Sequence, residues 1–262
     1  MNNQPIGIFD SGVGGISIWK ELHNRLPYED TIYLADSKNA PYGEKSKKEI
    51  VRLSCKNTDL LLEHGCKLIV VACNTATTNA IAYLRSQYPV PFIGIEPAIK
   101  PAALHSRSGT VGVLATKGTL SSALFHSTSK NHAHGIDIIE QEGTGLVELI
   151  EAGQGSSEHT KALLQKYLKP MLDAGIDHLV LGCTHYPHLI PLLKQLLPKG
   201  VRIIDSGAAV ANQTLKVLQK EGLPASDHGV TTHTFYTNSE VELLAPFLND
   251  VNGELQVFFK DF

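Results

Sequence analysis

Short apolar runs alternate with longer stretches of helical periodicity along most of the chain. Each run has the length of a strand and is bounded by turn residues, so it predicts a buried strand. In the first third of the chain these runs are IGIF (6–9), TIYLAD (31–36), KLIVVA (67–72) and PFIGI (91–95). Strands and helices in alternation are typical of a mostly parallel sheet with helices on both faces. We therefore expect an α/β protein.

One helix of this first part has clear signals at both ends. A helix over 46–64 is predicted because Ser46 and Glu49 have the spacing of a capping box. Gly65 follows, and glycine is the favoured residue just beyond the end of a helix. The sequence after Cys73 then predicts another helix, which Pro89 ends.

The second half of the chain repeats this pattern. Its predicted strands are VGVLAT (111–116), GIDIIE (135–140), LVLGC (179–183) and RIID (202–205). Helices are expected near 119–131, over LVELIEAG (146–153), over 157–174 and from about Pro187. Pro170 is expected to kink the helix over 157–174, because proline removes a hydrogen-bond donor and clashes with the preceding turn.

Two pairs of segments suggest an internal duplication. VVACNTATT (70–78) resembles LGCTHYPHL (181–189), since each continues an apolar strand and carries a cysteine at the strand end. Upstream, IGIFDSGVGG (6–15) is matched by VGVLATKGT (111–119). The matching positions are separated by 110 and 105 residues, respectively, and similarity at a nearly fixed offset indicates two related units.

The chain is therefore predicted to form two pseudo-symmetric, three-layer α/β domains with mostly parallel sheets and an active site in the cleft between them. We expect the first domain to comprise 1–97 plus 207–262, and the second to comprise 98–206. The tail is too short for a stable domain of its own, so it should dock on the first unit as extra sheet and helix. Its predicted elements are a helix from 208, a strand HTFYTN (233–238), a helix SEVELLAPFLN (239–249) and a strand LQVFF (255–259).

Composition and charge narrow the functional classes. The chain has 262 residues, of which 42% are hydrophobic and 19% are charged, as in an ordinary globular protein. A net charge of -3 and a pI near 6.4 give no electrostatic reason to expect binding to nucleic acid or to a membrane surface. The N-terminus lacks the basic and apolar regions of a signal peptide, and no stretch has the length of a membrane span. A cytoplasmic location is expected.

Two of the four cysteines are candidates for chemistry. Cys55, Cys66, Cys73 and Cys183 lack the spacing of a disulfide framework, so free thiols are expected in a reducing compartment. Cys73 and Cys183 each lie between a strand and a predicted helix, where the helix dipole would lower the thiol pKa. A single cysteine at a strand end is often only a small core residue. Two cysteines in matching positions favour a functional role.

The carboxyl ends of parallel strands are where such folds bind ligands. The polar residues expected at these ends are Asp10, Asp36, Cys73, Thr116, Cys183 and Asp205. Two thiols on opposite walls of one cleft suit a reaction that needs an acid on one side of a carbon and a base on the other, such as inversion of a stereocentre. Asp10 is a candidate to orient or deprotonate Cys73, and His185 is the candidate beside Cys183.

Other functions fit the same residues less well. A dinucleotide site would need the pattern G-x-G-x-x-G, but Ser17 occupies the third glycine position, although Asp36 ends the second strand as expected. A zinc site at Cys183, His185 and His188 lacks a fourth ligand nearby. A cysteine hydrolase would leave one of the two cysteines without a role, and the lysine motif of P-loop nucleotide triphosphatases is absent from the sequence.

Taken together, the motifs closely resemble those of glutamate racemases, the cofactor-independent enzymes that supply D-glutamate for bacterial peptidoglycan. The resemblance spans nearly the whole chain and rests on IGIFDSGVGG, LADSKNAPYGEKS, VVACNTATT, TKGT, LVELIE, LGCTHYPHL and IIDSG. The DSGVGG loop and the HYP sequence after GCT favour glutamate racemases over the related aspartate racemases. The resemblance implies two α/β domains related by a pseudo-twofold axis, with the tail returning to the first.

The resemblance also implies roles for individual residues. Cys73 would take the α-proton of D-glutamate and Cys183 that of L-glutamate, while Asp10 and His185 would be the supporting acid and base. Glu151 matches a glutamate of the family in the LVELIE helix, although by sequence alone it reads as a solvated helix end. The residues implied to bind substrate are Asp10, Ser11, Pro41, Tyr42, Gly43, Cys73, Asn74, Thr75, Thr116, Cys183, Thr184 and His185.

The implied reaction uses no cofactor and no metal, and its only implied partner besides a second copy of the chain is the small-molecule substrate. We expect a homodimer or a monomer–dimer equilibrium, with no nucleic acid or membrane partner. Glu44 and Lys45 depart from the arginine that many members of the family have after PYG-x. Two alternatives stay open at this point: another amino-acid racemase of the superfamily, and a non-catalytic glutamate-binding regulator that contacts DNA gyrase.

Overall fold

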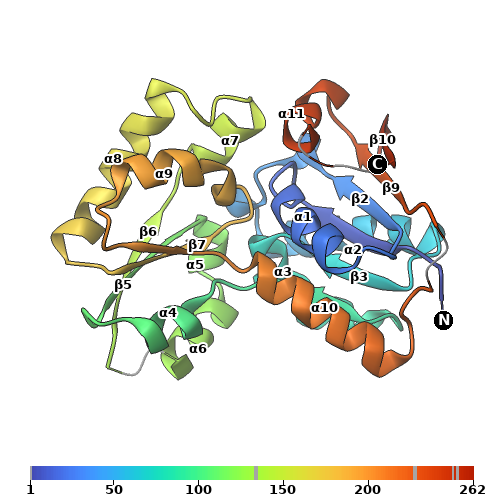
Figure 1. Ribbon diagram of the computed structural model, residues 1–262, viewed down its shortest axis with the longest axis horizontal. Coiled ribbons are helices and arrows are strands. Elements are labelled where there is room, and N and C mark those ends of the chain that lie inside the picture. The colour runs from blue at the N-terminus through green and yellow to red at the C-terminus, as the bar shows by residue number, and fades with distance from the viewer. Residues whose placement is uncertain (1, 133–134, 227–228, 250, 252–253) are drawn as a thin grey trace.

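The computed structural model describes residues 2–132, 135–226, 229–249, 251 and 254–262. These residues form two lobes, and each lobe is a parallel sheet between two layers of helices (Figure 1). All the described strand pairs are parallel. The predicted fold class, two α/β units with parallel sheets, is therefore confirmed.

The first sheet has six strands in the order β10-β9-β2-β1-β3-β4. Their bounds are β1 Ile6–Asp10, β2 Thr31–Ala35, β3 Leu68–Val71, β4 Phe92–Gly94, β9 Thr232–Thr237 and β10 Glu254–Phe259. Helices α1 (Ile16–Arg25) and α10 (Gly207–Glu221) cover one face, while α2 (Lys47–Glu63) and α3 (Asn74–Gln87) cover the other. The central strands are buried on both faces, which is why β1 and β3 are continuous apolar runs rather than alternating ones.

The second sheet has four strands in the order β6-β5-β7-β8. Their bounds are β5 Thr110–Ala115, β6 Asp137–Glu142, β7 His178–Gly182 and β8 Arg202–Ile204. One face is covered by α4 (Ile99–His105), α5 (Lys117–Leu120) and α6 (Ala123–His132). The other face is covered by α7 (Leu146–Glu151), α8 (Glu158–Asp173) and α9 (Ile190–Leu196), as Figure 1 shows.

The two sheets share one strand order. The four strands β2-β1-β3-β4 of the first sheet correspond in position to β6-β5-β7-β8 of the second. In this correspondence β1 matches β5 and β3 matches β7, which are the strands that carry the duplicated sequence segments. The carboxyl ends of the strands that precede Cys73 and Cys183 therefore occupy equivalent places in the two units. The exact domain boundaries stay a prediction.

The tail adds to the first sheet. Strand β9 pairs with β2, and β10 pairs with β9 to form the edge of the sheet. Phe235 of β9 is fully buried, with its ring centroid 4.8 Å from that of Trp19 on α1 and 5.6 Å from that of Tyr33 on β2. These aromatic contacts explain why a segment too short to fold alone is ordered here.

Some helix predictions were wrong in detail. The helix expected over 119–131 is two helices, because the Ser122 hydroxyl accepts a hydrogen bond from the N–H of Phe125 and starts α6. The helix expected over 239–249 is reduced to two short turns, 3-10 helix η4 (Val241–Leu243) and α11 (Ala245–Leu248). Helix α8 runs through Pro170 without a break, and the kink expected there stays a prediction.

The capping box predicted for α2 is only half formed. Ser46 accepts the N–H of Glu49 at 3.3 Å, as expected. The Glu49 carboxylate, however, bonds to Arg52 instead of returning to Ser46. The helix ends before Gly65, which has a positive φ of 74° and thus a conformation that favours glycine.

No helix among the described residues is long and apolar enough to cross a membrane.

The packing of Phe235 gives a test of how the tail is held. Phe235→Ala should lower the free energy of unfolding by about 3–5 kcal/mol, because it removes a large buried ring and leaves a cavity. Urea unfolding followed by circular dichroism would measure the change. Phe259→Ala on β10 is the matched control, since this ring is 62% exposed, and its effect should stay below about 1 kcal/mol. Equal effects of the two changes would contradict the assignment of Phe235 as the anchor.

Candidate active site

The carboxyl ends of the central strands of both sheets meet at one small cavity. It encloses about 240 Å³ of empty volume, and both thiols line it although Cys73 is only 4% exposed and Cys183 only 6%. The residues that line this cavity are Ser11, Pro41, Tyr42, Gly43, Cys73, Asn74, Thr75, Thr116, Val147, Cys183, Thr184 and His185. The structure therefore brings together nearly all the residues that the sequence analysis selected for binding.

Cys73 lies at the N-terminus of α3, as expected. Its sulfur accepts the N–H of Ala76 at 3.4 Å and lies 3.8 Å from the hydroxyl oxygen of Ser11. Burial nevertheless raises the pKa of the Cys73 thiol well above its ordinary value, and the charge of Asp10 adds to the rise. The prediction that the helix terminus would lower this pKa was wrong, because burial of the sulfur outweighs the contact with the helix N–H group.

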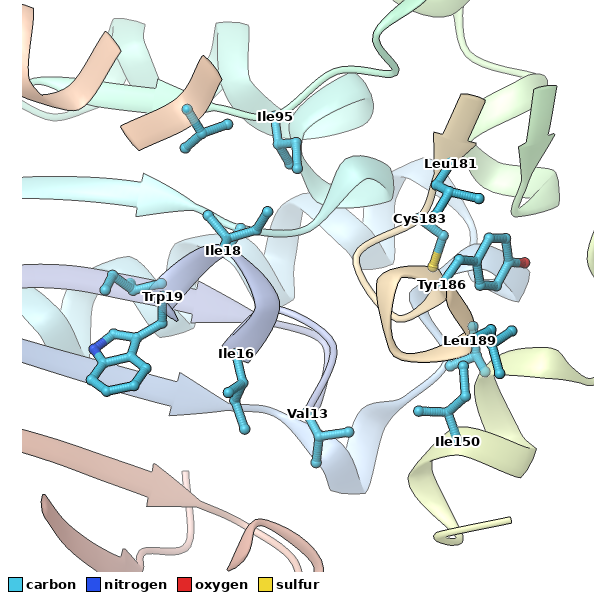
Figure 2. Packing of buried hydrophobic residues seen from close by; sticks show 14 of the residues in the cluster. Val13, Ile16, Ile18, Trp19, Ile95, Ile150, Leu181, Cys183, Tyr186 and Leu189 are labelled. Carbon is cyan, nitrogen blue, oxygen red and sulfur yellow. The ribbon is translucent and has the colours of Figure 1, made fainter. Parts of the chain in front are cut away.

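Cys183 has a different setting. The residues after β7 form a turn, a 3-10 helix η3 (Tyr186–Leu189) and only then α9, so Cys183 does not cap an α-helix. The expectation that both cysteines occupy equivalent helix ends was therefore wrong. A proline at 187 suits this tight turn, since it has no N–H to donate. Figure 2 shows Cys183 beside Tyr186, with Leu189 on the same turn packing into the apolar cluster.

His185 and Glu151 form a pair next to Cys183. The Nδ1 atom of His185 lies 3.8 Å from the Cys183 sulfur, and its Nε2 atom lies 2.5 Å from Oε1 of Glu151. Burial alone would lower the pKa of His185, but the hydrogen bonds to Cys183 and Glu151 outweigh it and raise the pKa well above its ordinary value. The ring lies between a thiol and a carboxylate, and this setting favours its protonated form.

Glu151 also joins the two units. Its Oε1 atom accepts the N–H of Val13 at 2.7 Å, and its Oε2 atom accepts the hydroxyl of Ser37 at 3.0 Å. Val13 and Ser37 follow strands of the first sheet, whereas Glu151 ends α7 of the second unit. The interpretation of Glu151 as a solvated helix end was therefore wrong, because the first unit supplies donors that a local sequence pattern cannot indicate.

Asp10 is fully buried at the end of β1. Its Oδ2 atom accepts the N–H groups of Gly12 and Gly15, both at 3.1 Å, and its Oδ1 atom accepts the hydroxyl of Thr184 at 3.1 Å. These bonds shape the glycine-rich loop and reach the second unit, whereas Ser11 is the residue in contact with Cys73. Burial raises the pKa of Asp10, and the charge of His185 offsets only part of that rise.

The other polar groups of the cavity differ in how they are satisfied. Tyr42 donates its hydroxyl to Asp36 at 2.5 Å, and the hydroxyls of Thr75 and Thr116 lie 2.8 Å apart across the two units. The peptide bond between residues 40 and 41 is cis.

Within the part of the chain that the structure describes, neither amide atom of the buried Asn74 side chain has a hydrogen-bond partner. A buried amide without a partner is costly, so it marks a place where a ligand would be stabilised.

Two of the polar strand-end residues lie outside the cavity. Asp36 supports Tyr42 from behind, and Asp205 accepts the N–H of Gly207 at the start of α10. Val147 lines the cavity but was not predicted, because an apolar residue in a helix normally indicates core packing. The available signal was its position four residues before Glu151, which places both on one face of α7.

Glu44, the departure from the family pattern, lies in an adjoining cavity. This second cavity shares Pro41, Gly43, Thr116 and Val147 with the first and is also lined by Glu44.

The geometry does not support the zinc site that the sequence analysis considered at Cys183, His185 and His188. Among the described residues, no group of three or more His, Cys, Asp or Glu side chains is arranged to hold a metal ion.

Comparison with known proteins places this geometry in a family. A model of the Asp/Glu/hydantoin racemases matches residues 16–214. The chain belongs to this family. A glutamate racemase from Stutzerimonas stutzeri is 49% identical over 252 residues, which covers 95% of this chain and 94% of that protein. The resemblance drawn from the motifs is thereby confirmed, as is the predicted enzyme class, an amino-acid racemase and hence an isomerase.

Two solved structures of this racemase family have the same fold. A glutamate racemase from Bacillus anthracis matches with a TM-score of 0.89 at 28% identity, over 100% of this chain and 99% of that one. The enzyme from Escherichia coli matches with a TM-score of 0.84 at 36% identity, over 97% of both chains. The latter structure is a complex with L-glutamate and the activator UDP-MurNAc-ala.

The environment of His185 predicts a change in its titration. Glu151→Gln should lower the pKa of His185 toward its ordinary value, since the variant removes the adjacent negative charge. NMR titration of the His185 ring protons would measure this. Glu148→Gln is the matched control, because this exposed residue of α7 is not in contact with the ring, and it should leave the titration unchanged. A His185 pKa that is the same in the Glu151→Gln variant and the wild type would contradict the assignment.

Proposed function

We propose that the chain interconverts L-glutamate and D-glutamate at this cavity, without a cofactor, and so supplies D-glutamate for peptidoglycan synthesis. The main support is the presence of Cys73 and Cys183 in one cavity, each contributed by a different unit. Similarity to glutamate racemases, one of them solved with L-glutamate, supports glutamate as the substrate.

The proposed reaction uses the two thiols in turn. The thiolate of Cys73 removes the α-proton of D-glutamate, and the thiol of Cys183 returns a proton to the opposite face of the carbanion. L-Glutamate follows the reverse route, with Cys183 as the base and Cys73 as the acid. Each turnover therefore leaves one cysteine newly protonated and the other newly deprotonated, so a proton has to be exchanged before the next turnover in the same direction.

The two thiols are activated differently in this proposal. The protonated ring of His185, held by Glu151, provides a positive charge that stabilises a thiolate at Cys183. The described groups that act on the Cys73 sulfur are Asp10, Ala76, Cys183 and Ser11, none of which is a cation, and burial raises the pKa of this thiol. The ammonium group of a bound amino acid would bring a positive charge beside Cys73 and lower its pKa. Asp10 would act on this side through its charge and through the loop that places Ser11 against the sulfur.

The cavity offers suitable donors for the substrate carboxylates. The unpartnered amide of Asn74 can donate to a carboxylate, as can the hydroxyls of Ser11 and Thr75. The N-terminus of α3 adds N–H groups, which are well suited to anions, so no arginine is required. Donors fixed in a cavity that excludes water stabilise the developing charge at the α-carbon more strongly than water does. Movement of the two units would then admit and release the substrate.

The proposal is tested with purified protein that has been treated with a chelator and contains no pyridoxal phosphate. Each glutamate isomer should lose its optical activity, followed by circular dichroism, and should exchange its α-proton with solvent in D2O, followed by NMR. L-Aspartate serves as the comparison substrate. Binding of glutamate by calorimetry without exchange would favour the non-catalytic regulator, and faster turnover of aspartate would favour another racemase of the superfamily.

Single cysteine variants test the two-base mechanism. Cys73→Ala and Cys183→Ala should each reduce racemisation by at least about 10³-fold, because each removes a proton carrier that both directions need. Each variant should still eliminate chloride from one enantiomer of a 3-chloroglutamate, since elimination needs proton removal on one face only. Cys55→Ala is the control and should remain active, because Cys55 lies outside the cavity. Normal racemisation by either active-site variant would rule the mechanism out.

A further inference from the structure

Ser17 connects the glycine-rich loop of the first unit to the turn that carries Cys183. It lies in the first turn of α1, and its hydroxyl oxygen is 2.9 Å from the carbonyl oxygen of Gly14 and 3.0 Å from that of Thr184. Thr184 is the residue between Cys183 and His185. Ser17 is not among the residues that line the cavity, so its hydroxyl contacts the backbone of the site rather than the space a substrate would occupy.

The same turn is held on its other sides by the first unit. The hydroxyl of Thr184 donates to Asp10 at 3.1 Å. The ring of His185 lies so close to Gly14 that a Cβ atom there would be 2.2 Å from Nδ1. The single hydroxyl proton of Ser17 is shared between the carbonyl oxygens of Gly14 and Thr184, so Ser17 sets the distance between the loop and the peptide that precedes His185. The distance of 3.8 Å from His185 to the Cys183 sulfur depends on this peptide.

A separate set of contacts holds the Cys73 side. The hydroxyls of Thr75 and Thr116 lie 2.8 Å apart, and the amide of Asn79 donates to the carbonyl oxygen of Gly118 at 3.0 Å. These residues follow β3 and β5, whereas Ser17 and Thr184 follow β1 and β7. Contacts between the two units thus lie beside each of the two thiols.

We propose that Ser17 is a positioning residue for the Cys183–His185 pair and controls proton transfer on only one face of the substrate. This inference rests on the proposed function, in which Cys183 acts on the L isomer and Cys73 on the D isomer. Loss of the Ser17 hydroxyl would free the Thr184 carbonyl, let the His185 ring shift relative to the sulfur, and leave the Cys73 side in place. Ser17, which occupies the third glycine position of the dinucleotide-binding pattern, thereby acquires a role.

Racemisation rates alone cannot reveal such a one-sided effect. The two glutamate enantiomers have equal free energies, so the equilibrium constant is one and kcat/KM must change equally in both directions. Elimination separates the two faces, because it needs proton removal by one thiol only. Loss of the α-proton and of chloride from 3-chloroglutamate gives an enamine, which tautomerises and is hydrolysed to 2-oxoglutarate and ammonia.

The test measures 2-oxoglutarate formation from the L and D isomers of 3-chloroglutamate. Ser17→Ala should slow elimination from the L isomer about tenfold, the effect expected when one positioning hydrogen bond is lost, and should change that from the D isomer by less than about twofold. Ser17→Thr keeps the hydroxyl and should restore the rate of elimination from the L isomer to within about threefold of the wild-type rate. Asn79→Ala is the matched control at the other junction and should slow elimination from the D isomer instead.

Equal slowing of both isomers by Ser17→Ala, or slowing of neither, would overturn the inference. If Ser17→Ala does not fold, as judged by its urea unfolding midpoint, Ser17→Cys replaces it, since a thiol is a weaker donor of similar size, and the same one-sided loss is required. Failure of the proposed function has a different signature, because the wild-type protein would then neither racemise glutamate nor eliminate chloride from either isomer.

Discussion

The site depends on one carboxylate that both units must satisfy. Glu151 ends a helix of the second unit, yet its oxygens accept hydrogen bonds from Val13 and Ser37 of the first unit as well as from His185. A mostly buried carboxylate is stable only when it is paired and hydrogen-bonded, so the two units have to meet for these groups to be satisfied. The same contact raises the pKa of His185 beside Cys183. The packing of the two units and the electrostatic setting of His185 therefore share a physical cause.

The two halves of the site are alike in architecture but unlike in chemistry. Each thiol follows the equivalent strand of its sheet, and the residue two positions later faces a loop of the other unit. On one side that residue is His185, whose ring occupies the space above Gly14. On the other side it is Thr75, which meets the hydroxyls of Thr116 and Thr119. A duplicated fold thus places two thiols on one cavity in different electrostatic surroundings.

Much of the fold could be predicted from the sequence because its signals are local, whereas most of the cavity residues were implied by the resemblance to glutamate racemases. Buried parallel strands are short apolar runs, and the loops after them are where ligands bind. The predictions that were wrong concern effects that depend on distant groups. The thiol pKa of Cys73 depends on its burial and on the charge of Asp10, and the bonds of Glu151 come from loops more than a hundred residues away. Val147 was missed because an apolar side chain has the same pattern in a core and in a cavity wall.

The sequence by itself determined the two α/β units and the matching positions of the two cysteines, since periodicity and repetition are properties of the chain. Only the tertiary structure decided the environment of each thiol. Burial, charge and hydrogen-bond partners depend on distances in space, and the residues that set them here lie on opposite units. The hydroxyl of Ser17, which fits no sequence motif, meets the Thr184 carbonyl only when those units pack together.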